Sequence, residues 1–216
     1  MNKTKIVFLG DSITDMGRNR ENDFTPFSYG VGYVGVVASQ LTKNVPDVYR
    51  IYNRGVSGDN VAQLYARLRS DVWHLQPDVL SILVGANDVW HELDCMGVDI
   101  VRYEKIYRAI IEETKEKLPN VKMILCEPFV LKGTETASNY DYFLQVKDYA
   151  KVVKKLAEEY GLYFLPLQGK MDDAAAKFGA EYYLPDGVHP SISGAGLIAD
   201  EWMKLFNNMV RNGSKK

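Results

Sequence analysis

The chain has 216 residues, 46% of them hydrophobic and 25% charged, and a formal net charge of -2 at pH 7. This composition is typical of a globular protein, predicts one domain over residues 1–216 and excludes a disordered chain. The near-neutral charge without a basic stripe excludes nucleic acid as a partner, and no apolar run reaches the about 18 residues of a membrane span, so we expect no membrane partner either.

The N-terminus and the cysteines indicate the compartment. Residues 1–5 lead directly into an apolar run without a signal-peptide pattern, so we expect a cytoplasmic protein. Cys95 and Cys126 form no C-x-x-C pair, and we expect two free buried thiols. The sequence is compatible with a homo-oligomer but does not define one.

Short apolar runs typical of strands alternate along the chain with longer segments of helical periodicity. Strands are predicted over residues 5–10, 48–53, 79–84, 121–127 and 162–167, and helices over residues 31–41, 60–75, 100–118, 142–160 and 194–209. Most of the strands are continuously apolar, which is typical of a parallel sheet covered by helices on both faces. The pattern predicts an α/β fold, a three-layer α/β/α sandwich. Residues 129–139, with their Gly, Ser and Thr, are predicted to form a long surface loop of the kind that rims a site.

Four polar segments stand at the ends of predicted elements. Residues 10–12 follow the first strand, residues 55–59 the second and residues 85–88 the third, while residues 186–189 precede the last helix. In an open parallel sheet, the carboxyl ends of the strands face one crevice. We therefore expect these segments to meet there.

Their side chains suit the chemistry of acyl transfer. A serine hydroxyl needs an imidazole to take its proton and a carboxylate to orient that imidazole, and Ser12, His189 and Asp186 supply the three groups. The oxyanion of the tetrahedral intermediate needs preorganised donors. The backbone N–H groups of Ser12 and Gly58 and the side-chain amide of Asn87 can provide them.

Each segment alone also has a plainer interpretation. Gly-Asp-Ser is a common turn with a helix N-cap, Asp-Gly is an ordinary turn pair, and Asn-Asp often caps a helix. The four together, at matching strand ends, favour a site over four separate caps.

Other residues are candidates for contact with the substrate. Trp90 can stack on a sugar ring or close an acyl pocket, or it is a large core side chain. His91 either lines the pocket or lies on the surface. Asp15 and Arg18 either fix the loop after the nucleophile or bind the substrate, and the sequence does not separate these roles.

No cofactor or metal is expected. Residues 30–35 match the G-x-G-x-x-G string of dinucleotide-binding folds, but no buried strand is predicted directly before them, as that motif requires. P-loop, H-E-x-x-H and thiolate-cluster motifs are absent from the sequence. The G-x-S-x-G nucleophile elbow is absent too, which argues against an enzyme of the α/β-hydrolase type.

The motifs resemble those of the SGNH, or GDSL, hydrolases, a family named for residues that match Ser12, Gly58, Asn87 and His189. The Gly-Asp-Ser, Gly-x-Asn-Asp and Asp-x-x-His blocks of the family correspond to residues 10–12, 85–88 and 186–189, in family order. The resemblance implies ester hydrolysis through an acyl-enzyme, on a flavodoxin-like five-stranded parallel sheet of order 2-1-3-4-5.

Within that family, residues 10–15, 53–58 and 87–90 resemble the bacterial acetylxylan esterases and related carbohydrate deacetylases. The resemblance implies a serine esterase that removes acetyl groups from a small-molecule substrate, an acetylated xylo-oligosaccharide-like sugar. Two alternatives remain open. One is an acyl hydrolase for lipid or thioester substrates with the same residues, and the other is a non-catalytic carbohydrate-binding protein.

Overall fold

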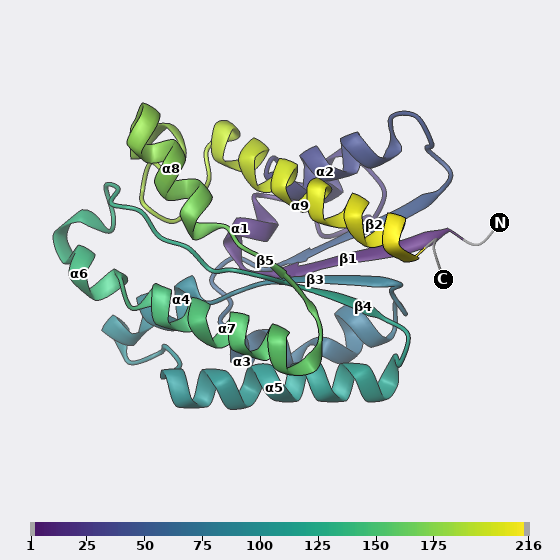
Figure 1. The fold of residues 1–216 in the computed structure, drawn as a ribbon, viewed down its shortest axis with the longest axis horizontal. Helices are drawn as coiled ribbons and strands as arrows, with labels where there is room; N and C mark the ends of the chain where they lie inside the picture. The colour runs from purple at the N-terminus through teal and green to yellow at the C-terminus, as the bar shows by residue number, and fades with distance from the viewer. Residues whose placement is uncertain (1–2, 214–216) are drawn as a thin grey trace.

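The computed structural model describes residues 3–213 and shows a parallel β-sheet between two layers of helices (Figure 1). The strands are β1 (Thr4–Gly10), β2 (Tyr49–Gly55), β3 (Val79–Leu83), β4 (Lys122–Cys126) and β5 (Tyr163–Leu165). They pair in the order β2-β1-β3-β4-β5, and every pair is parallel. Both the predicted three-layer α/β fold and the strand order are confirmed.

The helices divide between the two faces of the sheet, as Figure 1 shows. One layer holds α2 (Tyr33–Thr42), α8 (Gln168–Phe178) and α9 (Ile192–Gly213), and the other holds α3 (Val61–Ala66), α5 (Ile100–Lys117) and α7 (Val146–Tyr160). Short helical turns, α1 (Ser12–Asp15), α4 (Ala86–Trp90) and α6 (Tyr140–Phe143), lie toward the carboxyl ends of the strands. No helix described within residues 3–213 is long and apolar enough to cross a membrane.

The core under α9 explains why this helix packs on the centre of the sheet. Trp202 is fully buried, stacks on Phe206 at 4.9 Å between ring centroids and lies 5.0 Å from the ring of Phe8 in β1. Its indole Nε1 donates a 3.1 Å hydrogen bond to Ser81 Oγ in β3, so the polar atom of a buried indole is satisfied. These contacts tie the last helix to the two central strands, which places the segment before it, residues 186–189, beside the end of β1.

Several predicted elements differ from those observed. The helix predicted over residues 60–75 is divided into α3 and a π-helical turn (Arg69–Trp73), because Arg67 leaves the helical conformation with φ -108 and ψ 10. The helix predicted over residues 142–160 is divided into α6 and α7, and α8 was not predicted. Cys126 is buried as expected, but Cys95 is exposed.

The segment of residues 129–139 also differs from the prediction. Phe129, Val130 and Leu131 are buried, as is Thr136, so this part of the chain is packed and is not a surface loop throughout. The G-x-G-x-x-G string follows a 3-10 turn (Pro26–Tyr29) and runs into α2, so no strand stands directly before it, as the sequence predicted, and the helix begins at Tyr33 and not at residue 31.

Candidate active site

Ser12 is presented by the short helix that follows β1. Asp11 is the N-cap of α1, and its carboxylate accepts a 2.9 Å hydrogen bond from the backbone N–H of Ile13. This cap satisfies a backbone donor that would otherwise be free at the start of the helix. Ser12 is the first residue of α1 and stays partly accessible to solvent, while Asp11 beneath it is buried.

A continuous chain of hydrogen bonds joins Ser12 to Asp186. Ser12 Oγ lies 2.7 Å from His189 Nε2, and His189 Nδ1 lies 2.6 Å from Asp186 Oδ2. The other carboxylate oxygen of Asp186 accepts hydrogen bonds from the backbone N–H groups of Val188 (2.8 Å) and His189 (2.7 Å). The carboxylate is thus fixed on both oxygens, and the imidazole is held with one nitrogen on the acid and the other on the hydroxyl.

His189 and Asp186 shift each other's pKa values in opposite directions. The hydrogen bond to Asp186 raises the pKa of His189 above its usual 6.5 against the opposing effect of burial, and the negative charges of Asp186 and Asp11 add to the increase. Burial works to raise the pKa of Asp186, but the hydrogen bonds from His189 and from the backbone outweigh it and lower that pKa. The pair is therefore arranged to stabilise an imidazolium beside a carboxylate.

The loop that carries Asp186 is braced by residues 131–136. Backbone N–H groups of Leu131 and Thr134 donate to the carbonyls of Gly187 (2.9 Å) and Pro185 (3.0 Å), and those of Glu135 and Thr136 donate to the carbonyl of Asp186 (3.1 and 3.3 Å). This backbone pairing was not predicted from the sequence, in which residues 129–139 were recognised only as a segment near the site.

Gly187 is required where this brace meets the loop. Its φ of +100 lies in the region that favours glycine, and a Cβ there would lie 2.1 Å from Thr136 Oγ1. Thr136 Oγ1 in turn donates to the carbonyl of Leu131 (2.8 Å) and accepts from the N–H of Gly133 (2.9 Å). The close approach of these two segments sets the position of Asp186.

Gly58 and Asn87 lie on the neighbouring strand ends. Gly58 follows β2 with φ +87, and its N–H has no hydrogen-bond partner among the described residues 3–213. Asn87 lies in α4 after β3, and its Nδ2 donates a 3.0 Å hydrogen bond to the carbonyl of Asp59. A side-chain amide carries two donor hydrogens, so this bond fixes the amide and leaves one N–H that no described residue engages.

Of the other sequence candidates, Trp90 is beside the triad and Asp15 is occupied by the protein itself. The ring of Trp90 lies 6.4 Å from that of His189 and packs edge-on against Phe143 at 5.3 Å. Asp15 is 3% exposed, and its carboxylate accepts from the N–H of Ser57 (3.0 Å), from that of Arg18 (3.1 Å) and from Arg20. Between the two roles that the sequence left open for Asp15, these bonds favour fixing the loops.

Arg18 also contacts the loop after β2, and His91 makes no hydrogen bond with the triad. Arg18 Nε donates a 2.9 Å hydrogen bond to the carbonyl of Gly55, which favours the loop-fixing role for this residue as well. His91 begins a 3-10 turn (His91–Asp94), is partly exposed, and its side chain makes no hydrogen bond to a described residue. The two roles that the sequence left open for His91, lining the pocket or lying on the surface, therefore stay open.

Metal ligands are not grouped in the described part of the chain. Within residues 3–213, no cluster of three or more His, Cys, Asp or Glu side chains is arranged to hold a metal ion.

This chain is similar in sequence and in structure to known GDSL-type ester hydrolases. Residues 8–197 match the GDSL-like Lipase/Acylhydrolase family. The acetylxylan esterase of Geobacillus stearothermophilus is 35% identical over 209 residues, which are 93% of this chain and 92% of that enzyme. Its crystal structure superimposes with a TM-score of 0.83 at 32% identity, covering 94% of this chain and 93% of that one.

A second solved structure, described as a GDSL-like lipase from Parabacteroides merdae, has a TM-score of 0.87 at 42% identity and covers 94% of this chain and 95% of that one. For the Geobacillus enzyme, crystal structures exist of variants of a serine, an aspartate and a histidine that are described as catalytic mutants. The aspartate and histidine of that enzyme have the same sequence spacing as Asp186 and His189.

The fold and these matches define the class of protein, an ester hydrolase built on a parallel α/β sheet. More particularly, the chain belongs to the GDSL-like lipase/acylhydrolase family and is a carboxylic ester hydrolase that acts on a small-molecule ester. A non-catalytic carbohydrate-binding protein, the last alternative from the sequence, is therefore no longer a candidate.

Proposed function

We propose that the protein is a serine esterase that removes acetyl groups from acetylated xylo-oligosaccharide-like sugars. The observation that carries the proposal is the hydrogen-bond chain from Ser12 Oγ through His189 to Asp186, with distances of 2.7 and 2.6 Å. Such a chain converts a hydroxyl into a nucleophile at neutral pH. The relationship to an acetylxylan esterase at 35% identity supports the choice of substrate class.

The proposed reaction has two halves. Ser12 Oγ attacks the acetyl carbonyl while His189 Nε2 takes the hydroxyl proton, and Asp186 stabilises the imidazolium that forms. The backbone N–H groups of Ser12 and Gly58 and the free N–H of the Asn87 amide bind the oxyanion. His189 then protonates the sugar oxygen as it leaves, and an acetyl-enzyme remains.

In the second half, His189 Nε2 takes a proton from water, and the resulting hydroxide attacks the acetyl carbonyl. The same three donors bind the second oxyanion. Collapse of this intermediate breaks the bond to Ser12 Oγ, which recovers its proton from His189, and acetate leaves.

The alternative within the same chemistry is a hydrolase of longer acyl esters or thioesters. The ring of Trp90 lies beside that of His189 and is backed by the buried Phe143, and a bulky indole so close to the base favours a short acyl group over a long chain. The two substrates give opposite trends, because a short pocket loses activity with each added methylene, whereas a lipid site gains activity.

The test is a series of aryl esters from acetyl to octanoyl, followed by acetate release from acetylated xylo-oligosaccharides. We expect the highest kcat/KM on the acetyl ester and release of acetate from the sugar. Ser12→Ala and His189→Ala should each lose about three or more orders of magnitude in kcat, because the nucleophile and the base act as one unit. A rising activity with chain length would favour the lipid or thioester hydrolase, and near-normal activity of Ser12→Ala would contradict the site itself.

A further inference from the structure

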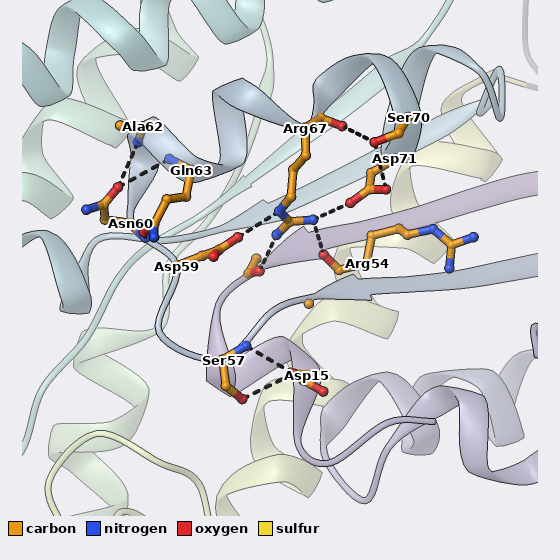
Figure 2. A network of polar contacts seen from close by, with 12 residues as sticks. Asp15, Arg54, Ser57, Asp59, Asn60, Ala62, Gln63, Arg67, Ser70 and Asp71 are labelled. Carbon is orange, nitrogen blue, oxygen red and sulfur yellow. Dashed lines mark hydrogen bonds and ion pairs between the residues drawn. The ribbon is translucent and has the colours of Figure 1, made fainter. Parts of the chain in front are cut away.

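The side chain of Arg67 lies at the centre of a network of hydrogen bonds and ion pairs beside the candidate site (Figure 2). It follows α3, and its guanidinium donates from Nε to Asp59 Oδ2 (2.7 Å) and from Nη1 to Asp71 Oδ2 (2.6 Å). Two backbone carbonyls complete the set, that of Arg54 from Nη1 (2.7 Å) and that of Gly10 from Nη2 (2.9 Å). One cation thus joins the end of β1 and the end of β2 with its following loop to the helical segment that carries Arg67 and Asp71.

Two of these segments carry the proposed oxyanion donors. Gly10 ends β1 and is separated from Ser12 only by Asp11, and Asp59 directly follows Gly58. The carbonyl of Asp59 also accepts the hydrogen bond from Asn87 Nδ2 at 3.0 Å. Arg67 therefore binds two residues next to the proposed donors. Gly10 precedes Ser12 by two positions, and Asp59 adjoins Gly58 and also accepts from the Asn87 amide.

Gly58 has open space on the side where a side chain would stand. No atom of the described residues 3–213, other than those of its chain neighbours, lies within 4 Å of the place that a Cβ on Gly58 would take. The residues on either side hold its backbone instead. Before it, Ser57 donates to Asp15 from its N–H (3.0 Å) and its hydroxyl (3.1 Å), and after it, Arg67 binds the carboxylate of Asp59, as Figure 2 shows.

Of these two sets of contacts, the ion pair between Arg67 and Asp59 is the better shielded from solvent. The side chains of Arg67 and Asp59 are 16% and 10% exposed, whereas Ser57 is exposed to solvent. A pair shielded from water keeps more of its attraction than an exposed contact, and the planar guanidinium holds its acceptors in a fixed geometry.

From these contacts we propose that Arg67 is a positioning residue for the oxyanion hole, holding the Gly58 N–H and the Asn87 amide in register with Ser12. The proposal rests on the proposed function, because it assumes that these groups bind the oxyanion. Preorganised donors lower the barrier because they need not reorient when the charge develops. A loosened loop should therefore lower kcat more than it raises KM.

Arg67→Lys tests this geometry while it keeps the charge. An ammonium group can pair with Asp59 or Asp71 but cannot reach all four acceptors from one planar fork. We expect kcat on the acetyl ester to fall by about tenfold to a hundredfold, part of the loss known for a deleted oxyanion donor, and KM to stay within about twofold.

The matched control is Arg108→Lys, the same substitution in a second multiply bonded arginine. Arg108 binds Glu104, Glu159 and the hydroxyl of Tyr160, which joins α5 to the end of α7. We expect kcat of this control within about twofold of the wild-type value. A kcat of Arg67→Lys within the same limits, or a loss carried only by KM, would overturn the proposal.

Hydrogen exchange separates this proposal from the proposed function. In Arg67→Lys, the backbone amides of residues 55–60 should exchange faster, whatever ester the enzyme prefers, and in Arg108→Lys they should not. Retained activity of Ser12→Ala would defeat the proposed function without changing this exchange result. If Arg67→Lys does not fold, Asp59→Asn breaks the same ion pair from the other end and should show the same loss of kcat with KM retained; without that loss, the proposal falls.

Discussion

The indole of Trp90 and the imidazole of His189 are neighbours, with their ring centroids 6.4 Å apart. Trp90 ends α4, the turn that also carries Asn87, so the indole beside His189 and a proposed oxyanion donor come from one short element. Phe143 packs edge-on against the indole at 5.3 Å and holds it in place. Because His189 lies 2.7 Å from Ser12 Oγ, we expect the indole to border the space in which the acyl group binds.

Replacing Trp90 by alanine should widen the range of accepted acyl groups. We expect Trp90→Ala to raise the ratio of kcat/KM for the butyryl ester over the acetyl ester by about tenfold or more, since each methylene in an apolar pocket changes the barrier by about 1–3 kcal/mol. Trp90→Phe keeps an aromatic side chain against Phe143 and should change the ratio less. The measurement is the aryl ester series, and an unchanged ratio in Trp90→Ala would show that the indole does not line the acyl pocket.

The pH profile should show the charge of Asp186. His189 acts as a base only when neutral, so its raised pKa places the acid limb of kcat/KM above the 6.5 of an ordinary histidine. Asp186→Asn removes the strongest cause of that increase, so the limb should move to lower pH while kcat falls by about three to four orders of magnitude. Asp11→Asn should move the limb in the same direction by less, since Asp11 contributes only through its charge, and burial, which raises its own pKa to about 7, leaves it partly protonated over this range. A limb that stays in place in Asp186→Asn would contradict the assignment.

The sequence could bring together those parts of the candidate site that depend on strand order. Ser12, Asn87 and residues 186–189 each stand next to a strand end or a helix start, and a parallel sheet brings such positions together. For this reason the nucleophile, the base and the acid could be proposed before the fold was known. The residues that hold these groups in place, such as residues 131–136 and Arg67, could not be predicted, because their contacts join segments that are distant in the sequence and carry no local motif.

Helix α8 shows why one element was missed. Only Gln168 and Met171 of this helix are buried, so its sequence has little apolar periodicity. Its first N–H groups are satisfied by Glu127, which accepts from Leu167 (2.6 Å) and Gln168 (2.8 Å) across the fold. A cap supplied by a residue 40 positions away leaves no signature near the helix start. The end of α3 at Arg67 was also missed because of a distant contact, since the Arg67 side chain bonds to the carbonyl of Gly10 at the end of β1.

Removing the hydroxyl of Thr136 should loosen the loop of Asp186. Thr136→Val keeps the shape of a buried side chain but leaves the carbonyl of Leu131 and the N–H of Gly133 without their partner. A lost partner for a buried polar group costs about 1–3 kcal/mol, so we expect a lower midpoint of urea unfolding and a reduced kcat. Thr42→Val removes a threonine hydroxyl that bonds only within α2 and is the matched control for activity. An unfolding midpoint of Thr136→Val equal to that of the wild type would contradict this role.

Asp88 should make the protein less stable as the pH rises. The residue is 0% exposed; one carboxyl oxygen accepts from the N–H of Val61 at 3.0 Å, and the other has no hydrogen-bond partner among residues 3–213. Burial raises its pKa to about 8, and the nearby charge of Asp11 adds to the increase. Between the unfolded pKa near 3.8 and this value, the folded protein holds a proton that the unfolded chain has released, so the free energy of unfolding falls with rising pH.

Asp88→Asn should remove this dependence, because an amide keeps the acceptor for Val61 and does not ionise. Urea unfolding between about pH 5 and pH 8 should show a smaller decrease in stability for the variant than for the wild type. The raised pKa of His189 and that of the buried Asp11, about 7, produce decreases of the same sign, since each group loses its proton as the pH passes through its folded-state pKa. Both groups are present in both proteins, so the difference between the two stability curves reports on Asp88. Parallel stability curves for the two proteins would mean that Asp88 is ionised in the folded state, and its unpartnered oxygen would then require a buried cation or water as its partner.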